Sequence, residues 1–200
     1  MGFVDAQYGY VERVARERGL VQTLAVLPYV CEKHEGMYRR GPERLPYVAH
    51  PLTMAHHAIA LGWIEDDLLA ACLLHDVCED CDVAVEDLPV GDCVKHSVAL
   101  LTKKDGFSKD RDNPSYYAAI AEDRIASLVK ILDRCNNVCA MPGVFPEKKM
   151  VRYMKETIAH LYPLMDSTME RFPDTADQIF LLRYHIMSVL HAIESLCTQG

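Results

Sequence analysis

The sequence predicts an all-α protein, and three observations support this fold class. Apolar residues recur along most of the chain with the period of an amphipathic helix. Glycine and proline residues separate these runs. We find no strand-rich segment, no internal repeat and no low-complexity region. We therefore expect a bundle of packed helices, with small hairpins at most.

The expected helices begin and end at residues that suit helix termini. Gly36 and Gly62 follow apolar runs, as helix-ending glycines do, and Pro51 suits a first helical position. In chain order we expect helices over residues 3–17, 21–35, 51–61, 66–80, 91–102, 116–121, 124–141, 150–171 and 174–197. Loops are expected over 37–47, 81–89 and 103–114, the last of them polar and mobile. Pro28 and Pro163 should kink or end their helices.

Length and composition favour one globular domain. The chain has 200 residues, of which 50% are apolar and 25% charged. We expect a single domain over residues 1–200, with a core over about residues 21–172 and the first and last helices packed on it. No apolar run has the length of a membrane span, and the N-terminus does not resemble a signal peptide. These features predict a cytoplasmic protein without a membrane partner.

The net charge argues against a nucleic-acid-binding protein, and the positions of the cysteines argue against a disulfide-stapled one. A net charge of −8 argues against a nucleic-acid partner, although a small anionic substrate needs only a local basic patch. The eight cysteines are expected to be reduced thiols, because most lie in apolar helical runs. Cys78 and Cys81 have the spacing of a redox pair or half a zinc site, and their role stays open because no second such pair accompanies them.

The run over residues 68–80 ends in a cluster of polar residues. Its first seven residues are apolar, so His75 and Asp76 need partners in a largely buried helix. Glu79 and Asp80 follow one turn later, and three acids this close repel one another unless a cation is present. Both a metal site and a helix end that frays into a solvated acidic loop agree with this stretch alone.

Two distant stretches favour the metal site. His50 lies just before the helix expected at Pro51, and Asp133 lies on an apolar helical run over residues 126–137. An aspartate among leucine, valine and isoleucine is rarely buried without a partner. Two imidazoles and two carboxylates make a donor set that suits a divalent transition metal. Asn137 lies one turn beyond Asp133 on the same helix face.

The order His50, His75-Asp76, Asp133 resembles the signature of the HD-domain metal-dependent phosphohydrolases. The segments over residues 39–51, 73–80 and 130–137 are similar to the hydrolase domain of RelA/SpoT-type alarmone enzymes, including the stand-alone small alarmone hydrolases. The likeness extends over about residues 30–164. It implies an HD-domain helical bundle that hydrolyses the 3′-pyrophosphate of (p)ppGpp, giving GDP or GTP and pyrophosphate.

The resemblance also implies roles for the clustered residues. The metal ligands would be His50, His75, Asp76 and Asp133, holding one Mn²⁺ per chain, although other divalent transition metals are open. Glu79 and Asp80 lie near the metal but outside the ligand set, where a water-orienting general base and its partner belong.

Several polar residues are candidates for substrate contacts. Arginines bind phosphate and stack on bases, so the basic loop before His50 either contacts the nucleotide or is a solvated surface loop. The predicted substrate-binding residues are Arg39, Arg40, Lys130, Asn137, Arg152 and Thr157. Arg134 either offsets substrate charge or lies on the surface. Thr102 and Lys103 resemble the family's Thr-Lys segment and either approach the substrate or belong to a surface loop.

One departure from the family pattern leaves the identity of the nucleotide substrate open. Residues 138–141 read Val-Cys-Ala-Met, where the alarmone enzymes usually carry a Met-Arg-Thr-Leu-like segment. Two alternatives therefore remain: an HD phosphohydrolase acting on another nucleotide or an NADPH-like cofactor, and a catalytically silent nucleotide-binding sensor. The sequence leaves the oligomeric state and the role of the last helix undefined.

Overall fold

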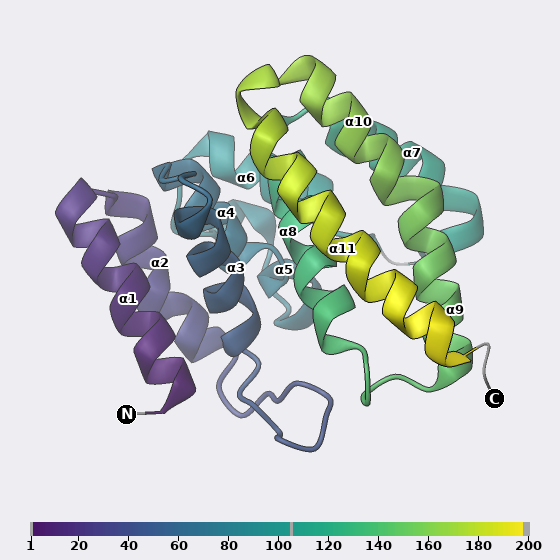
Figure 1. The fold of residues 1–200 in the computed structure, drawn as a ribbon. Coiled ribbons are helices and arrows are strands. Elements are labelled where there is room, and N and C mark those ends of the chain that lie inside the picture. Colours follow the sequence, from purple (N-terminus) through teal and green to yellow (C-terminus); the bar gives the residue numbers. More distant parts are fainter. Residues whose placement is uncertain (1, 105, 198–200) are drawn as a thin grey trace. The chain divides into compact units, whose positions relative to one another are not determined.

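The computed structural model describes residues 2–104 and 106–197, and the side chains of residues 196 and 197 are outside it. The predicted thiol of Cys197 therefore lies outside the described residues. Within the described ranges the secondary structure is helical, and the one isolated bridge pairs Tyr38 with Pro46 (Figure 1). The predicted all-α class is confirmed. None of the described helices has both the length and the hydrophobicity to cross a membrane.

The chain divides into two compact units, unit 1 from Met1 to Phe107 and unit 2 from Ser108 to Gly200. Unit 1 contains α1 Phe3–Arg18, α2 Val21–Lys33, α3 Ala49–Ala60, α4 Asp66–Leu74, α5 Val77–Asp80, the 3₁₀ turn Val85–Asp87 and α6 Asp92–Leu101. Unit 2 contains α7 Lys109–Ala121, α8 Arg124–Ala140, α9 Glu147–Glu156, a π-helical turn Thr157–Leu161, α10 Tyr162–Arg171, the 3₁₀ turn Pro173–Thr175 and α11 Ala176–Cys197. A single domain over residues 1–200 stays a prediction.

Unit 1 is built around α4. Every residue from Leu68 to Leu74 is fully buried, as expected for a short helix that is apolar on all sides. Helices α2, α3 and α6 pack against it, and α1 packs on α2 and α3 (Figure 1). The buried helix carries the chain directly to His75 and Asp76, so the polar pair is fixed by the core beneath it.

A carboxylate from α4 caps α2 and ties the two helices together. Asp66 accepts hydrogen bonds from the backbone nitrogens of Gln22 and Thr23, at 2.9 and 2.8 Å. The Thr23 hydroxyl also donates to Asp66, at 2.8 Å, and Thr23 is fully buried. The first N–H groups of a helix lack partners within it, so Asp66 supplies a cap that no residue before α2 provides.

Unit 2 is built around α8. Asp123 caps this helix by accepting a hydrogen bond from the backbone nitrogen of Ala126, at 2.7 Å. Helices α7, α10 and α11 pack against α8, and α10 also packs on α7 and α11 (Figure 1). The buried face of α8 holds both apolar residues and three charged ones, namely Lys130, Asp133 and Arg134.

Three helix predictions are wrong in detail. Residues 68–80 do not form one helix, because α4 ends at Leu74 and α5 begins at Val77. Helix α3 begins at Ala49, so His50 lies in its first turn instead of before it. Residues 109–114 are helical and not a mobile loop, and the Asp112 carboxylate accepts a hydrogen bond from the backbone nitrogen of Ser108 at the start of α7.

The expected kinks follow the prolines only in part. Pro28 lies inside α2 and does not end it. The helix expected over residues 150–171 changes to a π-helical turn at Thr157–Leu161, just before Pro163. A π-turn is a common accommodation where the regular hydrogen-bond ladder is interrupted, and proline lacks the N–H that the ladder needs.

Candidate functional site

His75 is held by the end of α4 in one orientation and one tautomer. Its Nδ1 lies 2.9 Å from the carbonyl oxygen of Cys72, and it is 4% exposed. A carbonyl oxygen only accepts, so Nδ1 carries a proton, and the ring when neutral presents a lone pair at Nε2. A backbone carbonyl on the far nitrogen is the usual way in which a metal-ligating histidine is oriented.

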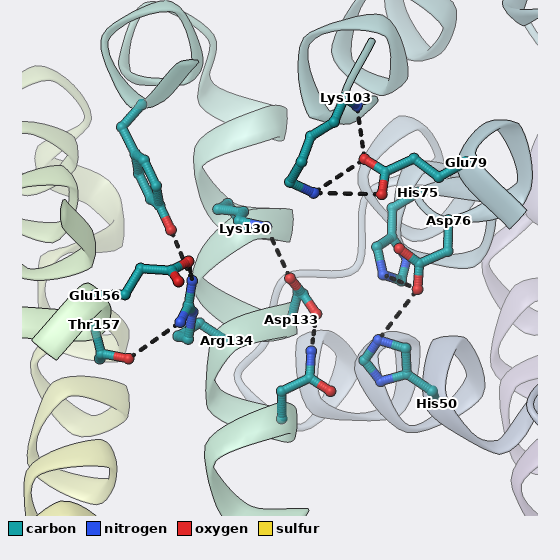
Figure 2. A network of polar contacts seen from close by, with 12 residues as sticks. His50, His75, Asp76, Glu79, Lys103, Lys130, Asp133, Arg134, Glu156 and Thr157 are labelled. Carbon is teal, nitrogen blue, oxygen red and sulfur yellow. Dashed lines mark hydrogen bonds and ion pairs between the residues drawn. The ribbon is translucent and has the colours of Figure 1, made fainter. Parts of the chain in front are cut away.

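His50 and Asp76 converge on the same point. The Nε2 atom of His75 lies 3.0 Å from Asp76 Oδ2, and the Nε2 atom of His50 lies 3.6 Å from that oxygen. The two imidazole rings meet edge to face with centroids 5.1 Å apart, and both histidines are buried. Figure 2 shows the three side chains pointing toward one another. The structure thus brings together the three predicted ligands that lie in unit 1.

This arrangement fits a bound cation. A neutral His75 and an ionised Asp76 would face each other with lone pairs at hydrogen-bond distance, which is repulsive in a buried site. A positive charge removes the repulsion, either as a second proton on the ring or as a metal ion. Two imidazole nitrogens and a carboxylate oxygen are donors that divalent transition metals prefer. The residues of unit 1 therefore fit the metal that the sequence predicts.

Tyr47 is a site residue that the sequence prediction missed. Its hydroxyl donates to Asp76 Oδ2 at 2.7 Å, which orients the carboxylate. Burial raises the pKa of Tyr47 well above its ordinary value, and the nearby Asp76 and Asp80 carboxylates raise it further. The phenol therefore stays a donor at neutral pH. The signal was available, because Tyr47 lies in the segment that carries the family resemblance before His50.

Glu79 and Asp80 follow on α5 and lie in different surroundings. Glu79 Oε1 accepts bonds from the backbone nitrogen of Lys103, at 2.7 Å, and from its Nζ, at 3.1 Å (Figure 2). The pKa of Asp80 is raised by burial, lowered by its hydrogen bond with Tyr47, and raised again by Asp76 and Glu79, for a net increase. The mutual repulsion expected of these acids is therefore present at Asp80.

Two backbone hydrogen bonds join the two ends of the basic loop before α3. The backbone nitrogen of Arg39 donates to Leu45 O at 2.8 Å, and that of Tyr47 donates to Met37 O at 2.9 Å. The Arg39 guanidinium lies 5.9 Å from the centre of the Tyr47 ring. Arg40 is exposed. The loop therefore places Arg39 on the ring that orients Asp76, whereas Arg40 extends to solvent.

His34 lies beneath the same tyrosine. Its ring packs on Tyr47 with centroids 4.7 Å apart, and only 3% of the residue is exposed. Burial lowers the pKa of His34; Asp76 raises it, and His75 and His50 lower it. A neutral, buried ring at this place supports Tyr47.

Unit 2 holds Asp133 in a buried polar group of its own. Lys130 Nζ lies 3.0 Å from Asp133 Oδ2, and Asn137 Nδ2 donates to Asp133 Oδ1 at 2.5 Å. Burial would lower the pKa of Lys130, but the Asp133 carboxylate raises it well above its ordinary value. Lys130 and Asn137, predicted to bind substrate, thus both contact the predicted fourth ligand.

Arg134 is not a surface residue, so that alternative from the sequence is wrong. It is 3% exposed, and its guanidinium lies 4.0 Å from the centre of the Tyr153 ring. It donates to Glu156 at 2.7 Å, to the Tyr117 hydroxyl at 2.9 Å and to Thr157 Oγ1 at 3.3 Å (Figure 2). The fixed charge of an arginine amid an apolar run was the signal that it has buried partners.

The last two predicted substrate residues differ in exposure. Thr157 is fully buried, accepts from Arg134 and donates to the carbonyl oxygen of Tyr153 at 2.8 Å. Arg152 is exposed on α9. The structure gives Thr157 an internal role, and contact of either residue with a substrate stays a prediction.

The seven cysteines with described side chains are free, as predicted. The pKa of Cys78 is raised to about 11, mainly by burial, and burial also raises the pKa of Cys81. A reactive thiol pair needs a lowered pKa. The redox interpretation of Cys78 and Cys81 is therefore not favoured.

Several curated relatives are named as guanosine-3′,5′-bis(diphosphate) 3′-pyrophosphohydrolases. The guanosine-3′,5′-bis(diphosphate) 3′-pyrophosphohydrolase of Vibrio cholerae is 35% identical over 143 residues, which cover 66% of this chain and 20% of that protein. The enzyme of that name from Aquifex aeolicus is 34% identical over 142 residues and is likewise covered over 20% of its length. The chain thus spans about a fifth of the length of these relatives. No family model matches the chain.

Smaller relatives are covered over most of their length. The guanosine-3′,5′-bis(diphosphate) 3′-pyrophosphohydrolase MESH1 of Xenopus tropicalis is 32% identical over 123 residues, covering 60% of this chain and 69% of that protein. A solved structure described as a metazoan orthologue of SpoT that hydrolyses ppGpp matches with a TM-score of 0.64 and 23% identity, over 82% of this chain and 96% of that one. At that identity, the structural match shows the fold.

The MESH1 protein of Danio rerio is 30% identical over 128 residues, which cover 62% of this chain and 71% of that protein. The all-α fold, the His-Asp cluster of unit 1 and the shared sequence agree with one another. This chain belongs to the family of guanosine-3′,5′-bis(diphosphate) 3′-pyrophosphohydrolases.

Proposed function

We propose that this chain hydrolyses the 3′-pyrophosphate of (p)ppGpp-type guanosine nucleotides in a metal-dependent reaction. Water is added across the bond between the 3′ oxygen and the pyrophosphate, which gives GDP or GTP and pyrophosphate. Family membership supports the reaction class. The contact of His75 Nε2 with Asp76 Oδ2 at 3.0 Å carries the proposal, because a bound metal ion would be shared by both atoms and would remove the repulsion between their lone pairs. A cytoplasmic location stays a prediction from the sequence.

The proposed metal ligands are His50, His75, Asp76 and Asp133, and the proposed ion is one Mn²⁺ per chain. Unit 1 presents the first three as a preformed group, and unit 2 presents Asp133 with one oxygen bonded to Asn137 and the other to Lys130. When bound, such a cation lowers the pKa of a water molecule and offsets phosphate charge.

The proposed general base is Glu79, with Asp80 as its partner. Lys103 contacts Glu79 through both its backbone nitrogen and its ammonium group, which holds the carboxylate in place. Asp80 has a raised pKa beside Tyr47, so it is suited to hold a proton more readily than an ordinary aspartate. The two acids therefore have surroundings that separate their roles.

The proposed substrate contacts begin with Arg39, whose planar guanidinium is suited both to phosphate and to a base face. Its position over Tyr47 keeps it near the orienting partner of Asp76. The other proposed contacts are Arg40, Lys130, Asn137, Arg152 and Thr157.

The alternative is an HD phosphohydrolase that acts on another nucleotide or on an NADPH-like cofactor. Residues 138–141 favour it, since they lack the polar and basic groups expected beside the nucleotide. Val138 and Met141 are buried, so this segment contributes to the core of unit 2. A silent nucleotide-binding sensor is less well supported, because a pure binder has no use for Glu79 and Asp80.

A substrate panel distinguishes these functions. Guanosine 3′-pyrophosphates, their adenine counterparts and NADPH are each incubated with the protein, with and without Mn²⁺, and phosphate and pyrophosphate release is measured. We expect pyrophosphate release from the guanosine 3′-pyrophosphates only, and only with metal. Phosphate release from NADPH alone would favour the alternative, and no turnover of any substrate would favour the sensor.

A further inference from the structure

Unit 2 contains a second cluster of metal-ligating side chains. Cys135 and Cys139 lie one turn apart on α8, and His185 lies on α11, which packs against α8. One ligating atom from each of the three lies within 4.8 Å of the other two. The Cys139 sulfur is 3.2 Å from His185 Nε2. Sulfur and imidazole nitrogen are thus already gathered at one place.

This cluster is separate from the proposed catalytic set. Cys135 follows Asp133 by two residues, and two residues turn an α-helix by about 200°. The pair Cys135 and Cys139 therefore lies on the face of α8 opposite to the pair Asp133 and Asn137. Among the described residues, it is the one group of three or more ligating side chains that includes a thiol.

We propose that Cys135, Cys139 and His185 bind a thiophilic transition metal, with Zn²⁺ as the representative ion, which joins α8 to α11. Two thiolates and one imidazole form a donor set typical of zinc. In a tetrahedral site with zinc–sulfur bonds of about 2.3 Å, ligand atoms lie about 3.7 Å apart. Small side-chain adjustments bring the present cluster to that geometry, and a fourth position stays open to water.

The exposure of the three residues supports the site. Cys135 is 2% exposed, and Cys139 and His185 are exposed. The site is therefore anchored in the core and open to an ion from solvent.

The test is a titration of the reduced, metal-free full chain with Co²⁺, whose thiolate complexes give a charge-transfer absorption that oxygen and nitrogen ligands do not. We expect one Co²⁺ per chain with this absorption, and its loss when Zn²⁺ displaces Co²⁺. The proposed catalytic ligands contain no thiol, so the signal separates the two sites. Hydrolysis of guanosine 3′-pyrophosphate with Mn²⁺ should persist in Cys139→Ser, so either proposal can fail alone.

Substitutions assign the ligands. Loss of a residue that only supports a metal ligand typically weakens metal binding about 10- to 100-fold. Loss of a ligand itself should weaken Co²⁺ binding more, so we expect a loss of more than about 100-fold in Cys139→Ser and His185→Gln. The matched controls are Cys93→Ser, at another exposed cysteine, and His191→Gln, at another exposed histidine of α11. Both controls should bind Co²⁺ as the parent chain does.

A thermal scan adds a second readout for the same variants. Zn²⁺ should raise the Tm of the parent chain and of both controls, since an ion that binds only the folded state stabilises it. It should raise the Tm of Cys139→Ser and His185→Gln by less than it raises the Tm of the parent chain, because only the proposed catalytic set remains to bind the ion. The proposal is overturned if the charge-transfer absorption is absent from the parent chain, or if it persists at full affinity in either ligand variant.

Discussion

Glu79 is the proposed general base of the reaction. Its carboxylate is bonded twice to Lys103, once through the backbone nitrogen and once through the ammonium group. These bonds fix the position of the carboxylate, as the role of a general base requires. Glu79 is also outside the group formed by His50, His75 and Asp76, so its role can be separated from metal binding.

We predict that Glu79→Gln lowers kcat by about 10²–10⁴, the usual effect of losing a general base. The amide keeps the shape of the side chain but accepts no proton at neutral pH. Metal content, measured by elemental analysis, should not change. Glu86→Gln serves as the control, because Glu86 is an exposed neighbour whose backbone oxygen, not its side chain, contacts Lys95. Loss of the metal from Glu79→Gln would make Glu79 a ligand instead.

Arg39 tests specificity at the same scale. We predict that Arg39→Lys raises KM for a guanosine 3′-pyrophosphate more than for a phosphodiester without a base, because lysine keeps the charge but loses the planar face. Steady-state kinetics on both substrates measure this difference. Arg44→Lys is the matched control, since Arg44 lies over Tyr38 in the same loop. An equal effect on both substrates, or none, would make Arg39 a surface residue.

At the scale of elements, α8 is held to α9 and the π-turn by one arginine. Arg134 bonds Tyr117, Glu156 and Thr157 while its guanidinium stacks on Tyr153. Because Arg134 follows Asp133 directly, this anchor also fixes the part of α8 that carries the predicted ligand. Removing one member of a buried ion pair leaves the other charge without compensation.

Arg134→Ala should therefore lower the free energy of unfolding by about 3–5 kcal/mol, measured by urea denaturation. The control is Arg124→Ala. Arg124 is the first residue of α8, and its ion pair with Asp174 is more exposed. Exposed pairs contribute about 1 kcal/mol or less. Equal losses in the two variants would show that Arg134 does not anchor α8.

The same group predicts a pH dependence. Burial raises the pKa of Glu156, but Arg134 and Lys109 lower it, with a net shift to about 2 from an ordinary value of 4.5. A lowered folded-state pKa contributes stability above the ordinary value, and this contribution is lost as the pH falls toward 2. The unfolding free energy of the parent chain should thus fall more steeply below about pH 5 than that of Glu156→Gln. Parallel pH profiles of the two proteins would contradict this assignment.

Helix periodicity predicts most elements because each has a continuous apolar face. The break between Leu74 and Val77 is hidden, since an apolar residue stands on each side of it and the backbone at His75 and Asp76 stays near helical angles. Residues 109–114 are polar throughout and carry no periodic signal, so α7 begins earlier than its pattern indicates. Local pattern describes the faces of helices, whereas caps and tertiary contacts decide where they start and stop.

The grouping of the three proposed ligands in unit 1 was predictable from the sequence, and the partners of these residues were less so. His50, His75 and Asp76 stand out as polar residues beside apolar runs, and the structure groups them. Tyr47 and Arg134 act through contacts distant in sequence, which no local spacing reveals. Burial of polar residues predicts that partners exist, but only the fold identifies them.

At the scale of the whole molecule, the proposed metal set takes three residues from unit 1 and one from unit 2. Family membership rests on relatives that this chain covers over 69% and 71% of their length. We propose that His75 and Asp133 hold one catalytic ion, so metal content and turnover should be lost together when either residue is changed.

The most direct test measures bound Mn²⁺ and pyrophosphate release in parallel for the parent chain, His75→Ala and Asp133→Asn. The controls are His96→Ala and Asp177→Asn, at exposed positions in unit 1 and unit 2. We predict one Mn²⁺ per chain and metal-dependent release of pyrophosphate from guanosine 3′-pyrophosphate in the parent chain and both controls. Both ligand variants should lose the ion and the activity together. Retention of one Mn²⁺ per chain by either ligand variant would contradict the proposed site.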